Sequence, residues 1–230
     1  MVWPARGAVS DSTLRDSVVA RALAGDTTIR RPTIFDLLNL DRLRLTKVGV
    51  TGGVAWPSNV ETSELLSVHA DYGEIARGVR IVFVVSYWGS QYEAATVQTY
   101  EQAIRDAVID PAGDDTVRLG KMSVSDISLG AEARWNPIRR GVVGGTVRPF
   151  LGAGVAAHAV NVEGAGLGDS FVEDGLDQIT AGLVGSAGAD VVILPNFQLT
   201  MLARYDLFSG VRHPTVRAGF SYVFDPQRGR

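Results

Sequence analysis

Val216-Arg217-Ala218-Gly219-Phe220-Ser221-Tyr222-Val223-Phe224 is the stretch of sequence that decides the fold of this chain. In a β-strand, successive side chains point to opposite faces. Every second residue from Val216 to Phe224 is apolar, and three of these five residues carry aromatic rings. The opposite face begins with Arg217 and continues with small residues and a valine. This combination is typical of a strand that meets lipid on one side and a polar lumen on the other.

Composition narrows the class of protein. The 230 residues suffice for one large β-barrel or for one to two globular domains. Charged residues make up 20% of the chain and the formal net charge is -3, so no strongly charged partner is implied. We find no basic patch of the kind that binds nucleic acid, and the absence of cysteine excludes disulfides and thiolate chemistry. No apolar run approaches the ~18 residues of a transmembrane helix, and residues 1–7 lack the apolar core of a signal peptide.

Alternation of apolar and polar residues continues along most of the chain. Each alternating run has at least the ~9–11 residues that a tilted strand needs to cross hydrocarbon. Strands of soluble proteins are usually nearer five or six residues. We predict eight strands: 43–56, 64–73, 78–90, 122–135, 147–161, 179–193, 197–208 and 214–224.

The connections between these strands alternate in length. Short turns are expected at 74–77, 136–146 and 194–196, and longer loops at 91–121 and 162–178. Short turns at one end and longer loops at the other are typical of outer-membrane barrels. Apolar residues spaced three or four apart predict a helix over Ala94–Val108 in the first long loop. We therefore divide the chain into a partly helical N-terminal extension (1–41), a barrel (42–224) and a C-terminal tail (225–230).

Charged residues gather on one face of nearly every predicted strand. If that face lines a narrow eight-stranded barrel, the charges must pair, because an unpaired buried charge costs several kcal/mol. We predict a lumen closed by ion pairs and hydrogen bonds, with no open aqueous pore. Its predicted members are Lys47, Asp71, Arg80, Asp126, Glu132, Arg134, Arg148, Asp190, Arg204, Asp206 and Arg217.

Alternation by itself leaves a second arrangement open, a soluble barrel with its apolar face turned inward. Two details favour a polar interior. The polar face is rich in glycine and serine, which suits a crowded lumen, and the apolar face ends in aromatic rings at both borders, as interface girdles do. These rings belong to Trp56, Tyr72, Tyr87, Trp135, Tyr205, Tyr222 and Phe224.

With these features the chain resembles small eight-stranded outer-membrane β-barrels, the group that includes the OmpA transmembrane domain and OmpX- and OmpW-like proteins. The resemblance covers about residues 43–224. Its most specific part is the last strand, which is similar to the C-terminal signal read by the barrel-assembly machinery, with Phe220, Tyr222 and Phe224 as its rings. It implies an all-β, antiparallel, up-and-down transmembrane barrel in the bacterial outer membrane. The partners that it implies are the assembly machinery and outer-membrane lipid, including lipopolysaccharide.

Other motifs give weaker signals for chemistry. Gly152-x-Gly154-x-x-Ala157 matches a relaxed dinucleotide fingerprint, but that motif needs a following helix, and here the alternation continues. The three histidines lack metal-ligand spacing, so we interpret them as interior histidines with hydrogen-bond partners. The alternative is a lumen cluster of His69 with Asp71 and also His158. The acidic loop 162–178 lacks the ligand order of an EF-hand.

We therefore expect a monomeric outer-membrane barrel with a structural or surface-interaction role, and no enzymatic activity, metal, cofactor or nucleic-acid partner. Two alternatives remain open at this point. One is a soluble, lipocalin-like carrier of an apolar ligand, and the other is an outer-membrane lipid-modifying enzyme on the same fold.

Overall fold

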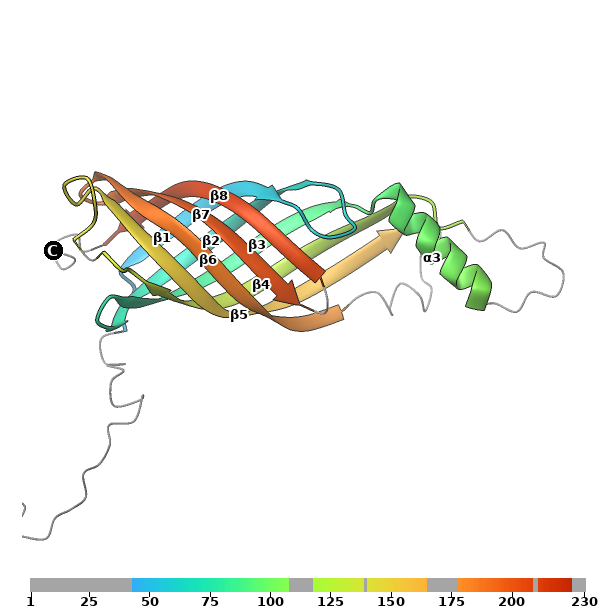
Figure 1. The fold of residues 1–230 in the computed structure, drawn as a ribbon, viewed down its shortest axis with the longest axis horizontal. Coiled ribbons are helices and arrows are strands. Elements are labelled where there is room, and N and C mark those ends of the chain that lie inside the picture. Colours follow the sequence, from blue (N-terminus) through green and yellow to red (C-terminus); the bar gives the residue numbers. More distant parts are fainter. Residues whose placement is uncertain (1–42, 108–117, 139, 165–177, 209–210, 225–230) are drawn as a thin grey trace, which may run out of the picture. The chain divides into compact units, whose positions relative to one another are not determined.

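The computed structural model describes residues 43–107, 118–138, 140–164, 178–208 and 211–224, which form a closed antiparallel β-barrel with one helix (Figure 1). Each strand pairs with its neighbours in sequence, and β1 also pairs with β8 to close the sheet. A closed sheet leaves no strand edge unpaired. The strands are β1 (Lys47–Ala55), β2 (Ser63–Ala76), β3 (Val79–Gln91), β4 (Met122–Trp135), β5 (Val147–Gly164), β6 (Gln178–Leu194), β7 (Phe197–Phe208) and β8 (Val211–Val223).

The predicted all-β, eight-stranded fold is confirmed. Each predicted strand corresponds to one observed strand, and the largest difference lies at β1, which begins at Lys47 rather than at residue 43. Before Lys47 the backbone still donates two hydrogen bonds to β2, from Arg44 and Thr46. The predicted helix is α3 (Ala94–Ala107). The predictions for residues 1–41 and 225–230 fall outside the described residues.

Strand register fixes the tilt of the barrel. Following paired residues once around the sheet leads from Ala157 back to its own strand at Val147, an offset of ten residues. Such an offset requires the strands to tilt, typically by about 35–45° from the barrel axis. An eight-stranded barrel of this kind has an interior that side chains can fill. The inward-pointing residues therefore reach one another across the lumen.

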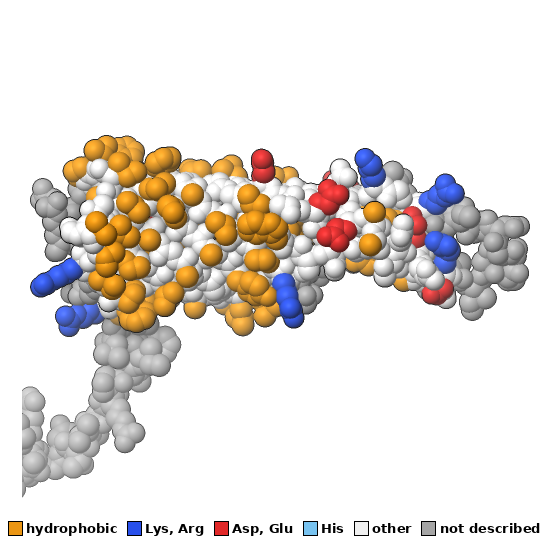
Figure 2. Space-filling model, turned by 45° about the horizontal axis from the view of Figure 1, so that its top comes forward, with side chains coloured by type: hydrophobic (Ala, Val, Ile, Leu, Met, Phe, Trp, Pro, Cys, Tyr) orange, Lys and Arg blue, Asp and Glu red, His pale blue; other side chains and the backbone are white. Residues whose placement is uncertain are grey.

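Outward-pointing side chains form an apolar wall over the middle of the barrel. Leu129, Phe220 and Leu183 are 58%, 62% and 64% exposed, respectively. Figure 2 shows hydrophobic side chains spread over this wall, whereas most acidic side chains lie toward the end that carries α3 and basic side chains lie at both ends. The rings predicted to border the wall are all exposed: Trp56, Tyr72, Tyr87, Trp135, Tyr205, Tyr222 and Phe224.

At the α3 end, the barrel rises beyond the apolar wall and holds a small apolar core of its own. The hairpin of β4 and β5 contributes Met122, Val124 and Val162 to this core. Val97 and Ile104 of α3 pack against it. The main chain of Leu119 donates a hydrogen bond to the Glu101 carboxylate (2.8 Å), which ties the loop to the helix. This core holds α3 on the long-loop end of the barrel.

Candidate functional site

The barrel interior is the candidate site, because charged side chains from nearly every strand meet there. Alternation along each strand sends polar residues inward, and the closed sheet brings distant strands within reach of one another. Glu132 and Arg204 are 1% and 3% exposed, which is the reverse of the exposure of the apolar wall. The lipocalin-like arrangement, which needs an apolar lumen, is therefore wrong for this chain.

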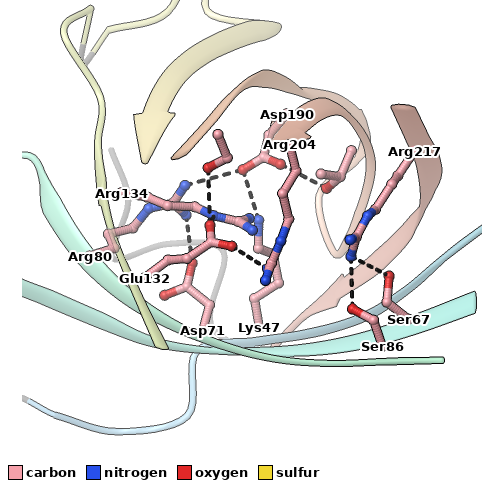
Figure 3. Close-up of polar contacts among 12 residues, drawn as sticks. Lys47, Ser67, Asp71, Arg80, Ser86, Glu132, Arg134, Asp190, Arg204 and Arg217 are labelled. Atoms are coloured by element: carbon pink, nitrogen blue, oxygen red, sulfur yellow. Dashed lines mark hydrogen bonds and ion pairs between the residues drawn. The ribbon is translucent and has the colours of Figure 1, made fainter. Parts of the chain in front are cut away.

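Near the end where the short turns lie, Asp190 of β6 binds two cations from the other side of the barrel. Its Oδ2 is 2.7 Å from Nζ of Lys47 on β1 and 3.2 Å from Nη2 of Arg80 on β3. Thr200 donates a hydrogen bond to Oδ1 (2.7 Å), and Arg80 also pairs with Asp71 (2.8 Å). Neither β1 nor β3 adjoins β6 in the sheet. These ion pairs therefore cross the lumen (Figure 3).

Closer to the α3 end than the Asp190 cluster, Glu132 of β4 binds two guanidinium groups. Its Oε1 lies 2.6 Å from Arg204 Nη1 of β7, and its Oε2 lies 3.0 Å from Arg134 Nε. Ser186 donates a further hydrogen bond to Oε2 (3.0 Å), and Arg204 also pairs with Asp206 (2.7 Å). Figure 3 shows Glu132 with Arg134 and Arg204 reaching toward it. All the charges of this cluster are buried, so each depends on its partners for solvation.

Arg217 of β8 differs from the other buried arginines, because hydroxyl groups rather than carboxylates accept its hydrogen bonds. Its Nη1 donates to Ser86 (2.9 Å) and Ser67 (3.2 Å), and its Nε donates to Thr215 (3.0 Å). Ser86 lies on β3, so this contact also spans the lumen. Figure 3 shows Arg217 set apart from the Glu132 cluster.

Toward the α3 end, Asp126 of β4 holds an aromatic group of side chains. Its Oδ2 accepts hydrogen bonds from Trp88 Nε1 (3.1 Å) and from His158 Nδ1 (2.9 Å). The His158 ring stacks on Phe208 at a centroid distance of 3.8 Å, and His213 lies against Trp88 at 5.0 Å. Rings rather than ion pairs fill this level of the lumen.

Two glycines of the interior make room for contacts across a strand. Gly49 of β1 lies between His69 of β2 and Ser221 of β8, and His69 Nε2 meets the Ser221 hydroxyl at 3.0 Å. A Cβ on Gly49 would lie 2.5 Å from both side chains. Gly152 of β5 lies in the same way between Arg134 and Ser186, whose side chains both bind Glu132.

All of the charged residues predicted for the lumen network point inward, and all but Arg80 and Arg148 are buried. Arg148 is half-buried, takes no part in the ion pairs described above, and its Nε has no hydrogen-bond partner among the described residues. His69 is a buried interior histidine bound to Ser221, and the alternative contact with Asp71 is not formed, because Asp71 binds Arg80 and Thr46.

Several polar residues of the lumen were not singled out in the sequence. Ser67, Ser86, Ser186, Thr200 and Thr215 complete the coordination of the charged groups. Each of them lies an even number of positions from a charged lumen residue of its strand. The alternation of the strands therefore predicts that these side chains also point inward. The dinucleotide fingerprint at Gly152 lies within β5, and the strand continues past it to Gly164 where the motif needs a helix, which excludes the phosphate-binding geometry.

In the part of the chain that the structure describes, no group of three or more His, Cys, Asp or Glu side chains is arranged to hold a metal ion. No described helix is long and apolar enough to cross a membrane.

Comparison with known proteins gives matches to solved structures alone. No family model and no curated protein matches the chain. The crystal structure of Neisserial surface protein A (NspA) is 19% identical, with a TM-score of 0.50 over 77% of this chain and 96% of that chain. Ail of Yersinia pestis, in complex with the heparin analogue sucrose octasulfate, is 14% identical, with a TM-score of 0.46 over 79% of this chain and all of that one. OprG of Pseudomonas aeruginosa is 13% identical, with a TM-score of 0.45 over 81% and 99%. The chain thus has the fold of small eight-stranded outer-membrane barrels.

Proposed function

We propose that this chain is an integral protein of the bacterial outer membrane with a structural or surface-interaction role and a lumen closed by its ion pairs. The observation that carries this proposal is the placement of apolar and charged side chains. A wall of leucine, valine and phenylalanine side chains faces outward, while Lys47, Glu132 and Arg204 are buried. In water such a wall would be a large exposed apolar surface, whereas in lipid it is the expected outer face of a barrel.

The closed lumen is supported by contacts that join opposite sides of the barrel. Lys47 reaches Asp190, Arg204 reaches Glu132, and Arg217 reaches Ser86, each from a strand that does not adjoin its partner's. We expect no passage wide enough for hydrated ions where these contacts cross the lumen.

A surface-interaction role would belong to the end of the barrel that carries α3. The helix has a core of its own beneath it, so it is held in place rather than merely tethered. Its exposed side includes Gln98, Thr99 and Gln102, and the polar surface around it faces away from the apolar wall. We propose that partners outside the cell meet this surface, and that the barrel acts as a monomeric support for it.

The lipid-modifying alternative lacks support from the described residues. The imidazole of His158, which binds Asp126, is buried inside the barrel. Its other ring nitrogen has no hydrogen-bond partner among the described residues, so it is not hydrogen-bonded to a hydroxyl as the base of a catalytic triad would be. Lipid A profiles from cells with and without the protein test this alternative, and we expect them to be identical.

Fractionation and conductance test the proposal itself. We expect the protein in the outer-membrane fraction, released by detergent but not by salt, and migrating on a gel at different positions before and after boiling. Reconstituted in a planar bilayer, it should give no steady ohmic current. Recovery of the protein in the aqueous fraction would contradict the membrane location, and a stable ion conductance would contradict the closed lumen alone.

A further inference from the structure

We propose that the turn between β4 and β5 is an interfacial anchor that inserts into the phospholipid headgroup zone at the short-turn end of the barrel. The part of the turn that carries this inference is the hairpin of residues 140–147. Figure 1 shows it at the end of the barrel opposite α3. The inference rests on the proposed membrane location and adds a second kind of lipid contact to it.

The tip of the hairpin is apolar and exposed. Val143 is 77% exposed, and Val142 beside it is also exposed. The hairpin has glycines at Gly141, Gly144 and Gly145, as turns usually do, but its two other tip residues are valines, where a turn in water favours Gly, Pro, Asn, Asp or Ser. Exposing an apolar side chain forgoes the free energy that is gained by removing it from water. Two adjacent valines at the tip therefore favour an environment other than water.

The backbone conformation at the tip supports the same inference. Val143 has a φ of 52°, in the left-handed region that a β-branched residue rarely adopts. The hairpin imposes this conformation through two backbone hydrogen bonds, from Val142 N to Val147 O (2.7 Å) and from Val147 N to Val142 O (3.2 Å). Such a conformation is strained for a β-branched residue, and strained residues of this kind tend to cluster at functional positions. Asparagine or glycine would fit this position in water without the strain.

The hairpin is continuous with the lipid-facing wall. Val147, which closes the hairpin, pairs with Val191 of β6, and Val192 N donates to Thr146 O (2.8 Å). Ile193 and Leu194, which follow on β6, are 52% and 56% exposed. Figure 2 shows hydrophobic side chains running to this end of the barrel. The valines of the tip thus extend a surface that already faces lipid.

The charge of the hairpin identifies the occupant. Arg140 is exposed at the base of the same hairpin. An apolar tip beside a cation is the composition of segments that lie in the headgroup region, where apolar groups reach the upper acyl chains and cations meet phosphate. We therefore commit to phospholipid, with its anionic phosphate, rather than to a protein partner.

Depth-dependent fluorescence quenching tests this inference. Because the chain has no cysteine, single-cysteine variants take one label each. Val143→Cys, Leu129→Cys and Lys121→Cys would carry a bimane group, and the barrels would be reconstituted in phosphatidylcholine–phosphatidylglycerol vesicles. Part of the lipid would bear a nitroxide either near the headgroup or deep in the acyl chain. A gel shift on boiling shows that each variant is folded.

The expected result is a different response at each position. The Val143 label should lose about half of its fluorescence to the shallow nitroxide and less to the deep one, as interfacial insertion requires. The label at Leu129, on the wall, should respond to the deep nitroxide, and the label at Lys121, on the long-loop side, to neither. A Val143 label as unresponsive as that at Lys121, with Leu129 quenched, would overturn the anchor alone. An unquenched Leu129 label would overturn the membrane location itself.

Discussion

The Glu132 carboxylate shows how single residues hold the lumen together. It accepts hydrogen bonds from the guanidinium groups of Arg134 and Arg204 and from the hydroxyl of Ser186. Without this carboxylate Arg204 keeps Asp206, whereas the buried Arg134 loses the carboxylate that it binds. Breaking a buried pair by removing one partner costs more than the pair contributes, because the other charge remains without compensation.

Replacing Glu132 with glutamine should therefore destabilise the barrel strongly. We expect the free energy of unfolding to fall by about 3–5 kcal/mol, the range measured for broken buried pairs. Urea titration of the refolded protein in detergent micelles, followed by tryptophan fluorescence, measures this change. The matched control is Glu64→Gln on β2, where the side chain is exposed and points outward. Equal midpoints for the two variants would show that Glu132 carries no special share of the stability.

Replacing Arg217 should lower the free energy of unfolding less than replacing Glu132 does. Its guanidinium binds three hydroxyl groups and no carboxylate, so Arg217→Met leaves no partner charge behind. We expect a loss below about 2 kcal/mol, since only neutral hydrogen-bond acceptors are left unsatisfied. The same urea titration checks this value. A loss equal to that of Glu132→Gln would mean that Arg217 takes part in an ion pair after all.

At the scale of strands, glycine sets how closely neighbouring backbones approach. A Cβ at Gly154 of β5 would collide with the backbone oxygen of Ala131 on β4. Gly185 of β6 points outward, and a Cβ there would meet nothing within 4 Å. The two positions thus differ in what surrounds them, although each lies in the middle of a strand.

Gly154→Ala should lower the stability of the barrel, and Gly185→Ala should not. We expect a loss of about 1–3 kcal/mol for Gly154→Ala, as for other substitutions that overfill a packed site. For Gly185→Ala we expect no loss, and up to about 1 kcal/mol of gain from the reduced freedom of the unfolded chain. The urea unfolding midpoints of the two variants, compared with that of the unmodified protein, measure these changes. Tolerance of alanine at Gly154 would mean that β4 and β5 lie further apart than described.

The final strand leads to a prediction about assembly. Phe224 and Tyr222 are exposed and meet edge to face, at a ring distance of 5.4 Å. If this pair belongs to the signal that the assembly machinery reads, Phe224→Ala should reduce the amount of folded barrel in the outer membrane several-fold. Phe83→Ala, on the same wall but on β3, is the matched control and should insert normally. Equal yields of heat-modifiable protein would argue against a signal at Phe224.

The sequence predicted the strands far better than the contacts between them. Alternation is a local property, so β4 was located to the residue, and the inward position of its charges followed. The partners across the lumen could not be predicted, because they depend on the offset that accumulates around the whole barrel. Lys47 and Asp190 are 143 positions apart in sequence, and nothing local joins them. The contact of His69 with Ser221 was missed for a related reason, since it passes over Gly49 of an intervening strand.

At the scale of the whole molecule, one sheet separates two environments. Its outer face is apolar and bordered by rings, and its inner face carries ion pairs that solvate one another. A barrel with the two faces exchanged would not be stable in a membrane, because its charged side chains would meet lipid. The central claim is therefore about direction: alternate residues along each strand meet hydrocarbon.

A nitroxide scan along β4 tests this claim most directly. Single cysteines from Asp126 to Ala133 would be spin-labelled in lipid vesicles, and the access of dissolved oxygen and of a water-soluble nickel complex would be measured by electron paramagnetic resonance. We predict that oxygen access peaks at Ile127, Leu129, Ala131 and Ala133, that the positions between them are closed to both reagents, and that no label in this span is open to nickel. Nickel access at Leu129 and Ala131, or a pattern with the opposite phase, would contradict a lipid-facing wall.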